Sequence, residues 1–341
     1  YPELHVIAAG SLLEFALKDL ASFGVGRVSS LFVYPMSFDE FLTAMGQEGL
    51  LRTKRNSSPT NPLPEAFYNR LVEAFRSYML VGGMPEAVAT YTETGSYRYS
   101  SDIVNEIIQG YQDDFAKYGA KANPLLLRQT LISVAHQAGA KFVYSRVEGK
   151  YRSAEVKVAL EMLKDAGLII PTYHTDANGV PLGAEINERV VKYLIHDTGV
   201  LLGILGIDDD IDDSIKEMMV ADSSDLVDKG HVAEMMAGLE LIKYSSPQKR
   251  HQLYYWQNMN KGTCAEVDYV IARSGSIVPI EVKSGVKGSM SSMYSLMRNP
   301  QKHIEMGIRC SLENFGTFES PDGKKIDIIP LYAISNLFAE K

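Results

Sequence analysis

One stretch of the chain decides the fold of its last third. It reads Cys264-Ala-Glu266-Val-Asp268-Tyr-Val-Ile-Ala-Arg-Ser-Gly-Ser-Ile-Val-Pro-Ile-Glu281-Val-Lys283-Ser-Gly285. Two runs at 267–272 and 277–282 are rich in β-branched and aromatic residues, as strands are. They flank Arg-Ser-Gly-Ser, a turn signal that is weaker than Asn-Gly. The stretch therefore predicts a β-hairpin.

The register of this hairpin follows if its turn is centred between Ser274 and Gly275. Asp268 then faces Glu281, and Glu266 faces Lys283. Because side chains alternate along a strand, these four polar residues share one face of the hairpin. The opposite, buried face would carry Tyr269, Ile271, Ile280 and Val282.

The predicted face places two acids opposite each other. Opposed Cβ atoms are about 4.5–5.5 Å apart, so Asp268 and Glu281 repel unless a cation lies between them. A divalent metal would supply that cation, with Lys283 beside it. The alternative is a solvated hairpin in which Lys283 pairs with one of the two acids, which contributes little stability at a surface.

This arrangement resembles the PD-(D/E)xK nuclease superfamily, in which an acid starts one strand and an acid-x-Lys follows on the next. The resemblance implies Asp268, Glu281 and Lys283 as catalytic residues. The superfamily usually adds an acid on a preceding helix, and Glu234 in the run 230–241 fits, with Glu240 as a second choice. Glu234, Asp268 and Glu281 would then bind Mg²⁺, which prefers carboxylate oxygens. Cores of this kind also occur as binding modules without cleavage activity.

Composition limits the remaining possibilities. The 341 residues predict two or three domains, and an apolar content of 45% is ordinary for a globular protein. The net charge of −8 means that any contact with DNA must be a local patch. Two cysteines give no disulfide framework, and no apolar run reaches 18 residues, so we expect a cytoplasmic protein without membrane contact. The chain starts at Tyr1, directly before a strand-like run, which we interpret as a fragment.

The N-terminal region has the pattern of a parallel α/β unit. Strands are predicted at 4–9 and 28–34, with a helix at 12–20 between them. Ser37 and Glu40 have the spacing of a capping box at the start of the next helix.

Four motifs along the chain are similar to those of a large bacterial and archaeal family, in which an AAA-type ATPase precedes a nuclease-like domain. They are Gly10-Ser11, Gly26-Arg27, Tyr34-Pro-Met-Ser37-Phe-x-Glu40-Phe41 and Gly82-Gly-Met-Pro-Glu86. The resemblance implies Ser11 as a sensor of the γ-phosphate and Arg27 as an arginine finger. The alternatives are a helix cap for Ser11 and a surface charge for Arg27. No G-x-x-x-x-G-K-[ST] motif is present, so ATP would bind only in an intact, longer protein.

These patterns predict a multidomain α/β protein. We expect the end of an ATPase core at 1–50, a helical region at 51–120, a winged-helix-like module at 121–200, an acidic linker at 201–226 and a nuclease-like domain at 227–341. Within them, a linker is expected at 52–64, helices at 65–80, 97–118, 124–138 and 153–165, and a wing from 168–174 and 190–195.

Two features leave alternatives open for nucleic-acid binding. Lys157 and Lys164 lie on the candidate recognition helix, but acids are mixed among them, so the module is equally interpreted as structural. Tyr254-Tyr-Trp256 predicts a strand, with base stacking as the other interpretation.

The function predicted from the sequence is an ATP-regulated, nucleic-acid-associated protein with a metal-dependent, nuclease-like C-terminal domain. The alternative is a non-catalytic module of an AAA-type ATPase that binds nucleic acid or protein. DNA and a second copy of the chain are the candidate partners.

Overall fold

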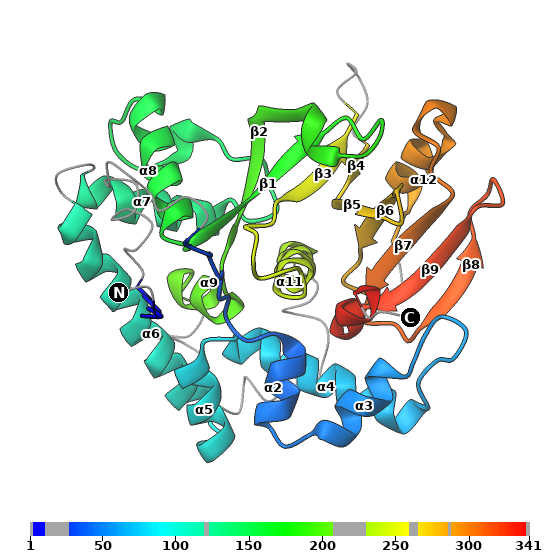
Figure 1. Cartoon of the computed structure of the whole chain (residues 1–341), viewed down its shortest axis with the longest axis horizontal. Coiled ribbons are helices and arrows are strands. Elements are labelled where there is room, and N and C mark those ends of the chain that lie inside the picture. The colour runs from blue at the N-terminus through cyan, green and yellow to red at the C-terminus, as the bar shows by residue number, and fades with distance from the viewer. Residues whose placement is uncertain are drawn as a thin grey trace.

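The computed structural model describes residues 3–10, 27–118, 123–206, 230–258, 265–285 and 288–338. The architecture is a mixed α/β fold with two mixed sheets (Figure 1). Ser11, the helix expected at 12–20 and the acidic stretch 207–226 lie outside the described residues.

The first helical layer begins at the predicted capping box. Ser37 Oγ accepts a hydrogen bond from Glu40 N, and the Glu40 carboxylate accepts one from Ser37 N at 2.7 Å. The helices of this layer are α2 (Phe38–Ala44), α3 (Glu48–Arg55), α4 (Glu65–Val81), α5 (Pro85–Thr94) and α6 (Tyr97–Asp114), followed by the 3-10 turn η1 (Phe115–Tyr118). The helices expected at 65–80 and 97–118 are confirmed. The expected linker is shorter than 52–64, because α3 continues to Arg55 and the side chain of Asn314 bonds to both backbone groups of the buried Leu63.

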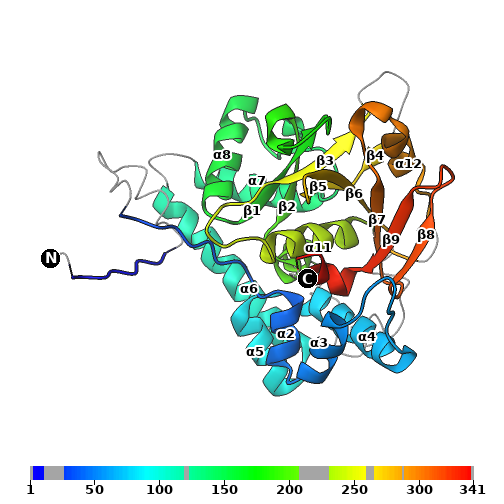
Figure 2. The ribbon, with the colours of Figure 1, turned by 45° about the vertical axis from the view of Figure 1, so that its right-hand side comes forward.

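The strands expected at 4–9 and 28–34 do not form. Both segments are extended and largely exposed, with Ile7 at 97% and Val33 at 85% exposure. A strand needs a neighbour to satisfy its backbone groups, and no strand runs beside either segment in the described part of the chain. Figure 2 shows the N-terminal segment reaching away from the body of the molecule.

The middle of the chain contains the expected helices and strands in a different setting. Its elements are α7 (Pro124–His136), η2 (Tyr144–Arg146), α8 (Ser153–Asp165), β1 (Ile169–Thr175), η3 (Leu182–Glu185), β2 (Ile186–Ile195) and α9 (Thr198–Ile204). β1 lies between β2 and β3 (Leu253–Gln257), so the hairpin expected as a wing is built into a sheet.

The remaining elements belong to the C-terminal part. They are α11 (Gly230–Lys243), β3, β4 (Glu266–Val267), β5 (Tyr269–Arg273), β6 (Ser276–Val282), α12 (Ser291–Arg298), η4 (Pro300–Lys302), β7 (Met306–Ser311), β8 (Gly316–Glu319), β9 (Lys325–Pro330) and η5 (Leu331–Leu337). One sheet has the order β2-β1-β3-β4, and the other has the order β5-β6-β7-β9-β8. Asp268 alone separates β4 from β5, so the chain passes from one sheet to the other at this residue.

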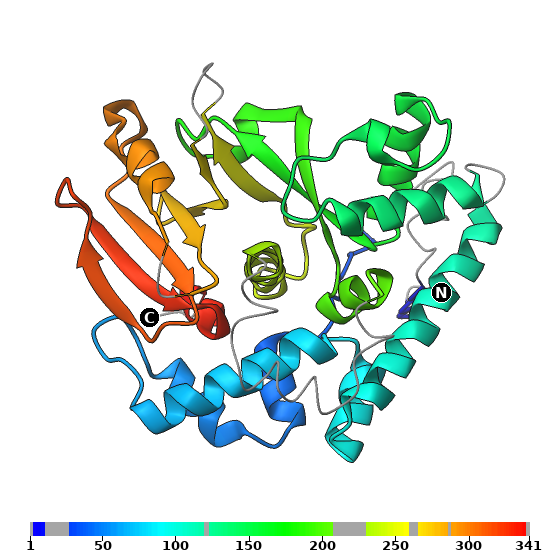
Figure 3. The ribbon, with the colours of Figure 1, turned by 180° about the vertical axis from the view of Figure 1, so that it is seen from behind.

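Helix α11 lies at the centre of the molecule. Figures 1 and 3 show it end-on between the two sheets and above the N-terminal helices. Every residue from Val232 to Ile242 is buried, which is typical of a helix enclosed on all sides. Helix α12 covers the other face of the five-stranded sheet, where Met293 and Leu296 pack with Val270 and Ile326.

Candidate active site

The predicted hairpin register is confirmed for Tyr269–Arg273 with Ser276–Ile280, but the expected pairing of Glu266 with Lys283 is wrong, because the strand breaks at Asp268 and Glu266 pairs with Gln257 on β3. Tyr269 pairs with Ile280, and the ladder continues to Arg273 opposite Ser276. Ser274 and Gly275 both have positive φ, at 50° and 78°, as a two-residue type I′ turn requires. Tyr269 and Ile280 face the core as expected, since both are 1% exposed.

Asp268 occupies the bend where β4 ends and β5 begins. Its Oδ2 accepts a hydrogen bond of 2.7 Å from the backbone N–H of Val282 on β6. The carboxylate is therefore fixed against the strand that carries Glu281. Burial raises the pKa of Asp268, and the hydrogen bond from Val282 opposes that shift.

Glu281 has one paired and one unpaired carboxylate oxygen. Its Oε1 accepts a hydrogen bond of 2.6 Å from Lys283 Nζ, whereas Oε2 is buried and has no partner among the described residues. The expected pairing of Lys283 with one of the two acids is therefore present, but the expected solvation is not, because Glu281 is only 5% exposed. Burial, and then the charge of Asp268, raise the pKa of Glu281 to about 7.

Asp268 and Glu281 form an acidic cluster with Glu234 of α11 and Glu266 of β4. Lys283 lies at the solvent edge of this acidic cluster, with its side chain 21% exposed. Its aliphatic part packs closely on Gly288, where φ is +152° and an added Cβ would lie 2.7 Å from Lys283 Cδ. Glycine at this position thus leaves room for the lysine.

A second lysine, which the sequence did not indicate, enters the acidic cluster from β2. Lys192 Nζ lies 2.8 Å from Glu234 Oε1 and 2.6 Å from Glu266 Oε1. It also lies 5.0 Å from the centre of the Tyr255 ring. Glu234, expected as a metal ligand, is therefore in contact with an ammonium group in this structure.

The acids of the cluster are electrostatically coupled. The pKa of Glu234 is raised to about 8. Burial is the largest cause, the charge of Asp268 adds to the rise, and the charge of Lys192 opposes it. Burial lowers the pKa of Lys192, but Glu234 and Glu266 raise it more, so it lies above its usual value. Burial is the largest cause of the raised pKa values of Glu234, Asp268 and Glu281, and repulsion between the neighbouring acids adds to it.

Arg309 on β7 also lies beside the site and was missed by sequence reasoning. It is the register partner of Glu281 on the parallel strand β7. Its Nε donates to Glu313 Oε2 at 2.7 Å, and its Nη2 donates to the carbonyl of Gly285 at 3.0 Å. These bonds fix the segment that follows Lys283.

The donor set is suited to a hard cation. Asp268 and Glu281 offer carboxylate oxygens, and Glu281 Oε2 lacks a partner. Within the described residues, no group of three or more His, Cys, Asp and Glu side chains is arranged to hold a metal. Two carboxylates nevertheless fit Mg²⁺, which commonly keeps several waters and takes only one or two protein carboxylates.

The other predicted site residues lie elsewhere. Arg27 is exposed, far along the chain from the acidic cluster. On α8, Lys157 is exposed and Lys164 forms an ion pair with Glu161. Tyr255 and Trp256 are buried in β3, which confirms the strand interpretation of that segment and leaves neither ring free to stack on a base.

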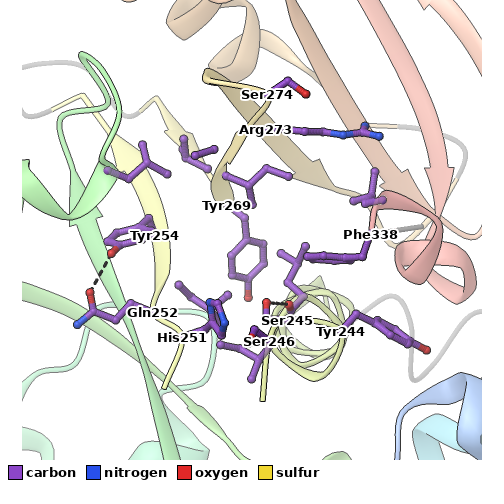
Figure 4. A pocket seen from close by; sticks show the side chains of 18 residues that line it. Tyr244, Ser245, Ser246, His251, Gln252, Tyr254, Tyr269, Arg273, Ser274 and Phe338 are labelled. Atoms are coloured by element: carbon purple, nitrogen blue, oxygen red, sulfur yellow. Dashed lines mark hydrogen bonds between the residues drawn. The ribbon is translucent and has the colours of Figure 1, made fainter. Parts of the chain in front are cut away.

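A cavity of about 520 Å³ lies beside β5 (Figure 4). The Tyr269 ring points into it from β5, and His251 and Phe338 line it from other segments. None of Glu234, Glu266, Asp268 and Glu281 lines this cavity, so the acidic cluster is separate from it.

Two domain families match separate parts of the chain. A domain of unknown function, DUF8612, matches residues 72–211, and another domain of unknown function, DUF4143, matches residues 229–334. No curated protein and no solved structure matches the chain. In the described residues, no helix is long and apolar enough to cross a membrane.

The residues of the candidate site fall in both matched regions. Asp268, Glu281, Lys283 and Glu234 lie in the second match, whereas Lys192 lies in the first. The acidic cluster is thus assembled from both matched regions.

Proposed function

We propose that the C-terminal part of this protein forms a metal-dependent, nuclease-like centre. In this proposal Asp268 and Glu281 bind one Mg²⁺, and Lys283 contacts a phosphate of the nucleic acid. The proposal is carried by the buried Oε2 of Glu281, which has no partner among the described residues. Burying such a group unsatisfied costs about 1–3 kcal/mol, and a coordinated cation would remove that cost.

The residues of the centre have distinct tasks. A bound Mg²⁺ would lower the pKa of a coordinated water and stabilise charge on the phosphate. Asp268 is held in place by Val282 N–H, so its second oxygen keeps a fixed position. Lys283 is the half-buried cation at the solvent edge of the centre, and in this proposal its ammonium group exchanges Glu281 for a phosphate oxygen when nucleic acid binds.

The nucleotide part of the proposal is that ATP bound by another domain or subunit regulates this centre. Domains of the DUF4143 family often occur in AAA-ATPase-associated proteins, which supports this context. The exposed position of Arg27 leaves its guanidinium accessible to a nucleotide on another domain or subunit. Exposed apolar side chains at Leu31 and Val33 agree with an extended segment that another strand could cover.

One observation favours the alternative, a non-catalytic module that binds nucleic acid or protein. Lys192 and Lys283 already pair with three of the four acids. A cluster that is partly neutralised by its own lysines can be stable without a metal.

The test is cleavage of single-stranded, duplex and branched DNA in Mg²⁺ or Mn²⁺. We expect Lys283→Ala to lower the rate by about 10²–10³-fold, because the lysine stabilises charge that develops on the phosphate. The matched control is Lys325→Ala, which removes an exposed lysine from β9 of the same sheet and should leave the rate unchanged. Equal rates for the wild type and Lys283→Ala would reject the catalytic role. DNA binding without cleavage in all three proteins would support the non-catalytic alternative.

A further inference from the structure

Lys192 is an unusual lysine, because its charged group is deep inside the molecule. The residue is 1% exposed, and its ammonium contacts the carboxylates of Glu234 and Glu266. An ammonium group is buried at a high cost unless carboxylates surround it. The ammonium group of Lys192 is therefore a structural part of the acidic cluster, since it can be buried only beside these carboxylates.

The number of carboxylates in the acidic cluster exceeds the number of ammonium groups that pair with them. Four carboxylates take part, namely those of Glu234, Glu266, Asp268 and Glu281, and two ammonium groups, those of Lys192 and Lys283, contact three of them. Arg309 is engaged by Glu313 instead. With every acid ionised, the cluster has a formal charge of −2, which one divalent cation would neutralise. Because the pKa values of Glu234 and Glu281 are raised to about 8 and about 7, binding of the cation near neutral pH would release protons from the cluster.

We propose that Lys192 permanently occupies one of two cation positions in this cluster, so that the centre binds a single divalent metal between Asp268 and Glu281. This inference rests on the proposed metal-dependent function and specifies it further. The second position, between Glu234 and Glu266, belongs to the lysine. Lys192 is a positioning residue, since its buried ammonium cannot reach a substrate.

The geometry separates the two positions. Glu234 Oε1 and Glu266 Oε1 both lie within 2.8 Å of Lys192 Nζ, and Tyr255 lies beneath it. The unpartnered Oε2 belongs to Glu281, on a strand of the other sheet. Glu266 lies on β4 of one sheet and Glu281 on β6 of the other, and Asp268 is the residue at which the chain passes between the two sheets.

The experiment counts bound Mn²⁺ per chain by electron paramagnetic resonance of the free ion, at neutral pH. We expect one ion on the wild type and two on Lys192→Met, because methionine fills the space of the lysine without its charge. The melting temperature of Lys192→Met should also rise more steeply with Mn²⁺. One ion on both proteins, or two on the wild type, would overturn the role of Lys192. No ion on the wild type would reject the metal centre itself.

A second pair of variants gives an answer even if Lys192→Met does not fold. Glu234→Gln should still bind one Mn²⁺, with an affinity reduced by no more than about tenfold, because Glu234 acts on the metal only through space. Asp268→Asn should bind none. Loss of the ion from both variants would make Glu234 a metal ligand and would overturn the assignment of its position to Lys192.

Discussion

At the scale of single residues, Glu234 shows how burial and neighbouring charge together set the state of an acid. It is 8% exposed and contacts Lys192, yet burial keeps its pKa raised to about 8. The charges of Asp268 and Glu266 add to the effect of burial, and the one ammonium group that opposes it is shared between Glu234 and Glu266. An acid with a raised pKa binds its proton more tightly in the folded state than in the unfolded state.

This shift predicts how the stability of the metal-free protein depends on pH. The stability gained from the protonated Glu234 is complete below its ordinary pKa of 4.5 and is lost as the pH rises through about 8. Between pH 6.5 and pH 9 we expect the wild type to lose ~1–2 kcal/mol more than Glu234→Gln, whose amide does not titrate. Urea unfolding in the presence of EDTA measures both slopes. A wild type that becomes more stable over this range would contradict the prediction.

At the scale of elements, the β5–β6 hairpin depends on a turn with an imperfect residue. Ser274 adopts a φ of 50°, a conformation that asparagine tolerates better than serine. Ser274→Asn would create the Asn-Gly pair preferred in type I′ turns. We expect it to raise the free energy of unfolding by ~0.5 kcal/mol, and we expect Ser274→Val to lower it, because a β-branched residue is strained at positive φ. Thermal unfolding of the two variants is the measurement, and a Val variant as stable as the Asn variant would refute the turn assignment.

The same hairpin shows what the sequence could predict. Its register from Tyr269 to Ile280 depends on local alternation and on a turn of two residues, so that part could be predicted without a structure. Local alternation did not show that the strand breaks at Asp268, where the chain passes into the other sheet. Lys192 could not be found in this way, because it reaches Glu234 through the packing of α11 on β2, and it reaches Glu266 on β4 over the Tyr255 ring of the intervening strand β3. The strands expected at 4–9 and 28–34 failed for a related reason, since an apolar run becomes a strand only when another strand lies beside it.

At the scale of the whole molecule, α11 connects the two sheets through a close approach at Gly238. A Cβ at this position would lie 2.4 Å from the hydroxyl of Tyr269 on β5 and 2.7 Å from Leu194 Cδ1 on β2. The Tyr269 hydroxyl also donates a hydrogen bond of 2.8 Å to the carbonyl of Glu234. A methyl group at Gly238 would therefore push against both sheets at once.

We expect Gly238→Ala to destabilise the fold by ~1–3 kcal/mol through overpacking. The matched control is Gly110→Ala on α6, where an added Cβ meets no atom within 4 Å. That change should stabilise the protein by ~0.5–1 kcal/mol, because alanine is the better helix former. Urea unfolding of both variants tests the comparison, and two changes of the same sign would contradict the central role of α11.

The parallel pairing of β1 with β3 has a consequence for how such a chain can evolve. β1 lies in the first matched region and β3 in the second, and their hydrogen bonds make one continuous sheet from both. If recombination replaced only one of the two regions, the new region would need a strand that pairs in parallel with the β1 or β3 that remains. It would also have to deliver a basic side chain at position 192 for the acids at 234 and 266. The two regions are therefore expected to be inherited as a pair, and their sequences should change together at these contacts.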